Sequence, residues 1–126
     1  MDIWYRKAAD QGYASAQSNL GLLYERGQGV RQSDAEAVKW YTLAANQGKV
    51  GSQYSLGRMY AKGKVGGKQE LVQAYKWLKL AAAGFPESSA YRSHALKNLA
   101  LAASQMTLAQ LAEAENFVGA WQPIKP

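Results

Sequence analysis

The chain repeats two short phrases at a nearly constant interval, and this periodicity constrains its fold more than any other feature. The phrase Trp-Tyr-x-x-Ala-Ala-x-x-Gly begins at Trp4 and again at Trp40, and a shortened form, Trp-Leu-x-x-Ala-Ala, begins at Trp77. Between these copies, Gln-x-x-Leu-Gly-x-x-Tyr-x-x-Gly begins at Gln17 and returns at Gln53. An interval of this length is typical of a solenoid built from stacked two-helix units. Solenoids mostly bind other molecules along an extended surface.

The spacing of apolar residues within the phrases predicts two kinds of helix. In residues 34–47 they recur with the period of an amphipathic helix, and we expect this to be the second helix of a unit. Residues 14–26 and 51–62 are expected to be first helices, and each carries a glycine in its middle, Gly21 or Gly57. Glycine inside a helix costs about 1 kcal/mol relative to alanine. Its recurrence therefore predicts that a neighbouring helix comes close at this point.

The repeat pattern loosens after Pro86. Residues 87–104 are expected to form one more first helix, and Thr107 opens a capping box that ends at Gln110. This box predicts a final helix that reaches Ala120 and closes the end of the array, because the last unit of a solenoid would otherwise expose its apolar face. The predicted fold class is an all-α solenoid of two-helix units with a C-terminal capping helix.

We expect a single domain over residues 1–126. Its predicted parts are a half repeat with the second helix only (1–12), two full repeats (13–48 and 49–84), and a degenerate repeat with the C-terminal cap (85–122). Met1 aligns with Ala37 and Ala74 of the later copies, so the first helix lacks its own beginning. We therefore expect the chain to be the C-terminal part of a longer protein.

Two motifs identify a family that the chain resembles. They are Leu20-Gly21-x-x-Tyr24-x-x-Gly27-x-Gly29-Val30 and Ala37-x-x-Trp40-Tyr41-x-x-Ala44-Ala45-x-x-Gly48. Together with their recurrence over residues 1–84, they resemble the Sel-one-like repeat (SLR), a relative of the tetratricopeptide repeat. The resemblance implies a right-handed α-solenoid, a superhelix of antiparallel helix pairs whose first helices line a concave surface. It also implies that this surface binds peptides or proteins, that the protein is a scaffold or adaptor, and that its source is bacterial.

Tetratricopeptide geometry also implies which positions of the first helices face this groove. The candidate peptide groove consists of Ser18, Leu22, Arg26, Tyr54, Arg58, Lys62, Lys97 and Leu101. Gly51 falls on the same face. Cations mixed with apolar and aromatic side chains suit an extended peptide that bears acidic groups or a terminal carboxylate.

The positive charge is concentrated in one part of the chain. The net charge is +6, and residues 58–97 hold eight lysines and arginines against two glutamates. This basic region favours an acidic partner, although a solvated face would have the same composition. Binding of nucleic acid or another anionic surface through it is the alternative function. It is disfavoured because no nucleic-acid motif is present and Tyr24, Tyr41 and Tyr60 fall on packing faces.

The sequence offers little for chemistry. We predict no catalytic residues, no cofactor and no metal site, because the single histidine, His94, has no nucleophile at a useful spacing and cysteine is absent. The Ser-x-x-Lys motif of β-lactam-binding proteins is also absent. A β-lactam-binding or hydrolytic enzyme is therefore a weaker alternative to a non-catalytic protein.

The sequence limits the possible partners and compartments but does not identify them. No apolar run approaches the roughly 20 residues that span a bilayer, so no membrane span is expected. A bacterial cytoplasm or periplasm both fit, and the compartment stays open. The N-terminal helix has no partner helix for the face with Ile3, Trp4 and Tyr5. Self-association through this face is a further expectation.

Overall fold

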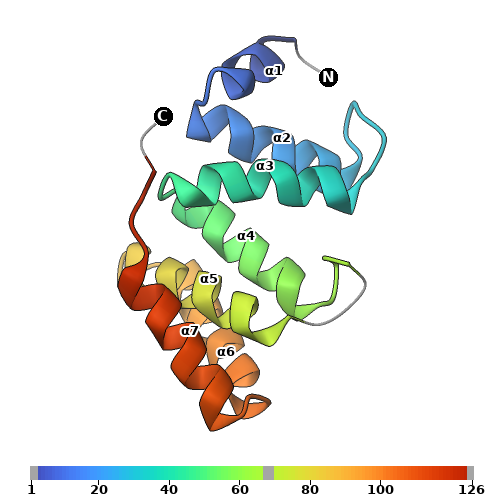
Figure 1. The fold of residues 1–126 in the computed structure, drawn as a ribbon. Helices are drawn as coiled ribbons and strands as arrows, with labels where there is room; N and C mark the ends of the chain where they lie inside the picture. The colour runs from blue at the N-terminus through green and yellow to red at the C-terminus, as the bar shows by residue number, and fades with distance from the viewer. Residues whose placement is uncertain (1–2, 67–69, 125–126) are drawn as a thin grey trace.

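The computed structural model describes residues 3–66 and 70–124, and all regular secondary structure in these ranges is helical. The helices are α1 (Ile3–Asp10), α2 (Ala14–Arg26), α3 (Asp34–Asn46), α4 (Val50–Ala61), α5 (Leu71–Gly84), α6 (Ala90–Ser104) and α7 (Leu108–Ala120). From α1 to α6, each helix packs against the next one along the chain, which gives a continuous stack (Figure 1). The predicted all-α solenoid is confirmed.

Helix ends follow from local chemistry. Gly27 ends α2 with a φ of 69°, a left-handed conformation that favours glycine, and its N–H donates to the carbonyl of Leu23. Ser33 begins α3 by accepting a hydrogen bond from the backbone N–H of Glu36 at 3.1 Å. At α7 both hydrogen bonds of the capping box between Thr107 and Gln110 are present.

The repeated tryptophans lie at the contacts between units. Trp40 of α3 packs with Ala9, Ala16 and Leu20 of the preceding helices, and all of these side chains are buried. One unit later, Trp77 of α5 joins a second buried cluster; its other members are Ala37, Tyr41, Ala45, Leu56 and Met59. Each tryptophan therefore fills the space against the unit before it, which makes these contacts the core of the array.

The glycines in the middle of the first helices mark close helix contacts, as the sequence predicted. A Cβ added to Gly21 would lie 2.6 Å from the ring of Tyr41. A Cβ added to Gly57 would lie 2.8 Å from the side chain of Leu78. Real Cβ atoms do not approach neighbours this closely, so the two helices of each unit can pack at this distance only because glycine is present.

A buried glutamine joins α2 to α1, and another joins α4 to α3. The side-chain amide of Gln17 donates to the carbonyl of Ala9, and that of Gln53 donates to the carbonyl of Ala45, both at 3.2 Å. Buried polar groups require such partners. The matching position in α6 is Leu96, which is 39% exposed. The third first helix therefore lacks this tie, a difference that the sequence analysis did not identify.

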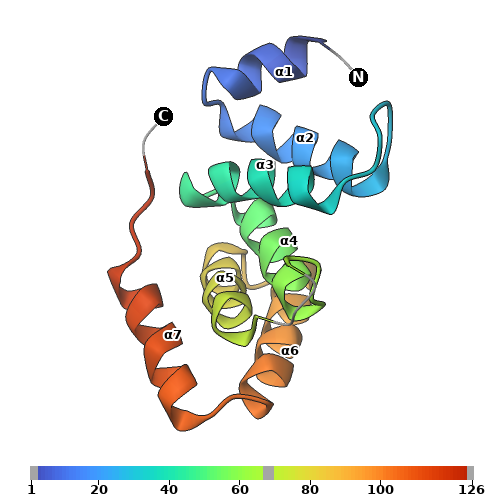
Figure 2. The same cartoon turned by 45° about the vertical axis from the view of Figure 1, so that its right-hand side comes forward.

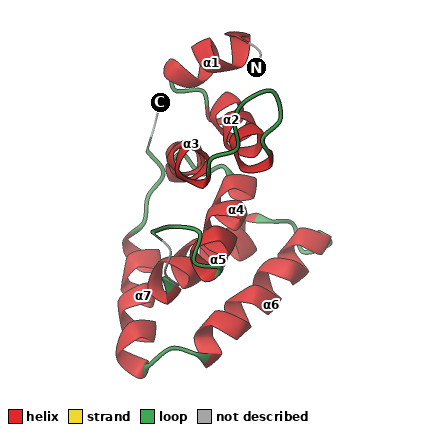
Figure 3. Ribbon diagram, turned by 90° about the vertical axis from the view of Figure 1, so that its right-hand side faces the viewer, coloured by secondary structure: helices red, strands yellow, loops and turns green. Residues whose placement is uncertain are grey.

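The C-terminal helix is present where the sequence predicted it. It packs along the side of α5 and does not cover α6, the helix before it in the chain. α7 packs mainly against α5, and the two helices α6 and α7 diverge from their connecting loop with α5 between them (Figures 2 and 3). Beyond α7 the chain runs back to the end of α3, where the N–H of Ile124 donates to the carbonyl of Asn46 at 2.7 Å. α7 therefore covers α5, and most of α6 stays exposed.

Polar and aromatic contacts explain this position of α7. The ammonium of Lys79 lies 2.8 Å from the Glu115 carboxylate, which also accepts a hydrogen bond from the Tyr75 hydroxyl. Because both groups donate to it, the pKa of Glu115 lies below its ordinary value. The ammonium of Lys76 lies 4.4 Å from the ring centroid of Trp77 and 5.6 Å from that of Phe117. These contacts join α7 to α5.

Candidate functional site

A pocket of about 350 Å³ lies between α2, α4 and the connection from α5 to α6. We call it the aromatic pocket. It is lined by Ser18, Asn19, Leu22 and Arg26 of α2, Tyr41 of α3, Gly51, Tyr54, Ser55 and Arg58 of α4, and Phe85 and Tyr91. Five of the eight predicted groove residues meet here. They come from two first helices, α2 and α4. Within each helix they are four residues apart, so they lie on one face.

A second pocket, of about 290 Å³, shares Arg58 with the first, and we call it the distal pocket. Arg58 lines both pockets, so the two hollows adjoin. Lys62 and Leu101 of the predicted groove line the distal pocket, together with residues of α4, α5 and α6. The remaining predicted residue, Lys97, is exposed and lines neither pocket.

An acidic side chain holds the central arginine in place. The Arg58 guanidinium donates to the Glu25 carboxylate at 3.2 Å, and the Tyr41 hydroxyl donates to the other oxygen of that carboxylate at 2.8 Å. The side chains of Arg58 and Glu25 are 30% and 19% exposed. Burial and the neighbouring carboxylate raise the pKa of Tyr41, so its hydroxyl remains a donor at neutral pH. The charge of Arg58 is therefore balanced by Glu25, whose carboxylate is held in turn by Tyr41.

Three aromatic rings form one wall of the aromatic pocket. The Phe85 and Tyr91 rings stack with centroids 5.7 Å apart, and the edge of Tyr54 approaches them at 6.1 and 6.3 Å. These separations lie in the range of favourable aromatic pairs. Phe85 and Tyr91 were missed by the sequence analysis because they lie where the repeat pattern breaks down. The one signal for them in the sequence was the presence of two aromatic residues, Phe85 before Pro86 and Tyr91 after it, around the start of the last first helix.

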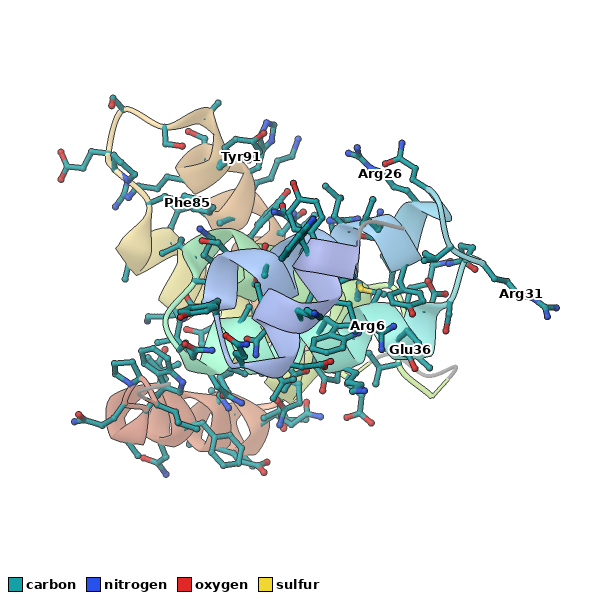
Figure 4. The ribbon with its side chains drawn as sticks, turned by 90° about the horizontal axis from the view of Figure 1, so that it is seen from above. Arg6, Arg26, Arg31, Glu36, Phe85 and Tyr91 are labelled. Atoms are coloured by element: carbon teal, nitrogen blue, oxygen red, sulfur yellow. The ribbon has the colours of Figure 1, made fainter. Side chains whose placement is uncertain are left out.

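The view from above places these features relative to the rest of the molecule. Phe85 and Tyr91 lie together on one side of the array, Arg26 lies on the same side at the end of α2, and α7 lies on the opposite side (Figure 4). The candidate groove and the C-terminal helix therefore occupy opposite faces.

A second exposed apolar surface lies at the N-terminal end. Trp4 is 72% exposed and Tyr5 is 41% exposed, whereas the matching Trp40 and Tyr41 are buried. With Ala8 and Tyr13 these side chains line a hollow of about 590 Å³ between α1 and α2. We call this surface the N-terminal face.

The described residues show no arrangement for metal binding or membrane insertion. Within residues 3–66 and 70–124, no three His, Cys, Asp or Glu side chains are grouped as metal ligands. His94 lies exposed on α6. In the same part of the chain, no helix has both the length and the apolar character needed to cross a bilayer.

Comparisons with known proteins agree on one family. Residues 3–13, 14–49 and 50–84 match a family model described as Sel1 repeat. A protective antigen of uropathogenic Escherichia coli strains with an SLR fold is similar at 31% identity, with a TM-score of 0.81 over 94% of this chain. A Sel1 repeat protein from Oxalobacter formigenes is similar at 31% identity, with a TM-score of 0.70 over 93% of this chain.

The chain spans 24% of the Escherichia coli protein and 48% of the Oxalobacter formigenes protein. A comparison with curated proteins found no significant match.

Proposed function

Because the chain belongs to the Sel1 repeat family, whose members generally act as non-catalytic protein-interaction scaffolds, we propose that it binds an extended segment of a partner protein. The segment lies along the aromatic pocket and the distal pocket. The observation that carries this proposal is that the two pockets adjoin at Arg58 and span three first helices, α2, α4 and α6. A continuous groove of this kind suits an extended peptide, which adds about 3.3 Å of length per residue.

The charge of the groove supports an acidic partner. Arg26 and Lys62 are exposed at the two pockets, whereas the charge of Arg58 is already balanced by Glu25. Arginine and lysine form charge-assisted hydrogen bonds with carboxylates. A partner segment with Asp or Glu residues therefore gains more from this surface than a neutral one.

Replacing Arg58 by alanine is expected to weaken binding at least tenfold, because the Glu25 carboxylate then faces an acidic partner without its counter-ion. Replacing Lys97 is expected to change affinity less than twofold, since Lys97 lines neither pocket. The partner is first captured from the native cell with the full-length protein and identified, and each purified variant is then titrated against it by calorimetry. Thermal melts of the variants control for folding.

An unchanged affinity of the Arg58→Ala variant contradicts this placement of the groove. A larger effect of Lys97→Ala than of Arg58→Ala moves the contact surface onto the exposed side of α6. Titration of a single-stranded oligonucleotide in parallel tests the nucleic-acid alternative. Binding that falls steeply with salt, as counterion release requires, would favour that alternative.

The N-terminal face supports a second proposal, association of two copies of this chain. In both later units the matching Trp and its neighbour, Tyr41 or Leu78, are buried against another helix. Exposure of such large apolar side chains to water is unfavourable, so contact with a second copy would stabilise them.

Light scattering at increasing concentration is expected to show a rising average mass for the chain with residues 1–126. A variant with Trp4→Ser and Tyr5→Ser is expected to remain a monomer, because it removes the apolar contact without changing the buried core. A constant monomer mass of the unmodified chain at all concentrations rules out this self-association.

A further inference from the structure

The aromatic pocket has the composition and size to recognise one particular side chain. We propose that it holds a single aromatic side chain of the bound peptide, next to an acidic residue of the same peptide, and that Gly51 determines this specificity by leaving room for the ring. This inference rests on the proposed function and names the class of peptide that the groove accepts.

The wall of the pocket favours an aromatic guest. Phe85 and Tyr91 stack on each other, and Tyr54 meets both by its edge, so the three rings form one continuous apolar surface. Tyr91 is 61% exposed although it is stacked on Phe85, so part of its ring is open to a guest. Leu22 of α2 adds an apolar contact to the lining. A guest ring gains area burial and further edge or offset contacts here.

The volume sets the size of the guest. The aromatic pocket encloses about 350 Å³. Pockets for small molecules range from roughly 300 to 1,000 Å³, so this one is at the lower end and fits one large side chain with part of its backbone. The remainder of the peptide must then lie outside, along the distal pocket.

The cations beside the wall exclude a positively charged guest. Aromatic groups often bind ammonium or guanidinium groups when the rings surround them. Here the three rings contact one another, and both Arg26 and Arg58 line the same pocket. A lysine or arginine of the peptide would therefore be repelled, whereas an Asp or Glu beside the guest ring would be attracted to the exposed Arg26.

Gly51 is the position that keeps the pocket open. It lines the pocket, and a Cβ added to it would meet no atom within 4 Å. The fold therefore does not require glycine here, in contrast to Gly21 and Gly57. The matching residue of the preceding unit is Ser15, so glycine is not a feature of the repeat either. A large side chain at residue 51 would project into the space that the guest ring occupies.

The test uses random octapeptides displayed on phage and selected against the full chain. Selected peptides are expected to carry Phe, Tyr or Trp at one shared position, with Asp or Glu within two residues. A synthetic peptide with the consensus is then titrated against the unmodified protein and two variants. Gly51→Leu is expected to weaken its binding at least tenfold. Gly119→Leu is the matched control: Gly119 also has no neighbour within 4 Å but lies on α7, at the opposite face, and its substitution is expected to leave affinity unchanged.

Each outcome separates the inference from the proposed function. Peptides that bind but share no aromatic residue, or share one beside Lys or Arg, overturn the inference and leave the proposed function standing. Tight binding of the consensus peptide to Gly51→Leu overturns the placement of the ring in this pocket. Failure to select any peptide that binds overturns both. A consensus peptide with its ring replaced by alanine should bind the unmodified protein and Gly51→Leu equally weakly. This result shows that residue 51 and the ring of the peptide are energetically coupled.

Discussion

Replacing Trp77 by alanine is expected to lower the free energy of unfolding by about 3–5 kcal/mol, the usual effect of removing a large aromatic side chain from a core. Trp77 is 3% exposed and packs in one cluster with Ala37 and Tyr41 of the preceding unit. The shortened side chain leaves a cavity between units that the surrounding helices fill only in part. Urea denaturation followed by circular dichroism measures the change.

The control is the same substitution at the first copy of the phrase. Trp4→Ala is expected to change the free energy of unfolding by less than about 0.5 kcal/mol in dilute solution, because Trp4 is 72% exposed. Similar losses at both positions would show that the Trp phrase contributes through its own helix. The assignment of these residues to the contact between units would then be wrong.

The size of this effect follows from the architecture. The free energy of unfolding of an ordinary domain is about 5–15 kcal/mol. The loss expected at Trp77 is a large fraction of this total. In a solenoid the stability is approximately a sum over repeats and the contacts between neighbours. The buried Trp belongs to such a contact, and the short array has few of them to compensate.

The repeat made the first five helices predictable. Helices α1 to α5 follow from apolar residues at helical spacing, and the glycines in the middle of α2 and α4 indicated where helices meet. The position of α7 was not predictable in the same way, because it depends on the pairing of Lys79 with Glu115, which are far apart in the sequence and belong to no repeated phrase. Periodicity gives the contacts that recur, and it is silent about those that occur once.

The candidate site shows the same division. Ser18, Leu22 and Arg26 share a helical face by their spacing, and the structure brings them to one pocket with the predicted Tyr54 and Arg58 of α4. The partner of Arg58 was not identified, because the repeat has no copy of the contact with Glu25. Phe85 and Tyr91 were missed for a related reason: they lie where the third unit departs from the pattern.

Phe85 and Tyr91 link the divergent third unit to the function that we propose. The buried Trp and Ala positions are the same in successive units, and they hold the array together. The groove residues differ between units: Ser18 and Leu22 correspond to Tyr54 and Arg58. With the aromatics of the divergent third unit, these differences give the pocket its one apolar wall and its cations. The binding preference that we propose therefore rests on residues that differ from one unit of the chain to the next.

The two glycines of α4 provide the sharpest test of the packing. Gly57→Ala is expected to destabilise the protein by about 1–3 kcal/mol, the range for overpacking a filled core. The added Cβ would lie 2.8 Å from the Leu78 side chain and 3.1 Å from its backbone nitrogen, so the helix itself must move. This loss exceeds the gain of about 1 kcal/mol that alanine otherwise brings to a helix.

Gly51→Ala is the matched control, because it makes the same substitution in the same helix at a position where the new Cβ meets nothing within 4 Å. It is expected to raise the free energy of unfolding by up to about 1 kcal/mol, since alanine has a lower conformational entropy in the unfolded chain than glycine. The two variants should therefore differ in sign in urea denaturation. Stabilisation by both would mean that α4 and α5 are not in close contact at Gly57. Destabilisation by both would mean that the space at Gly51 is filled, and the specificity proposed for the aromatic pocket would lose its basis.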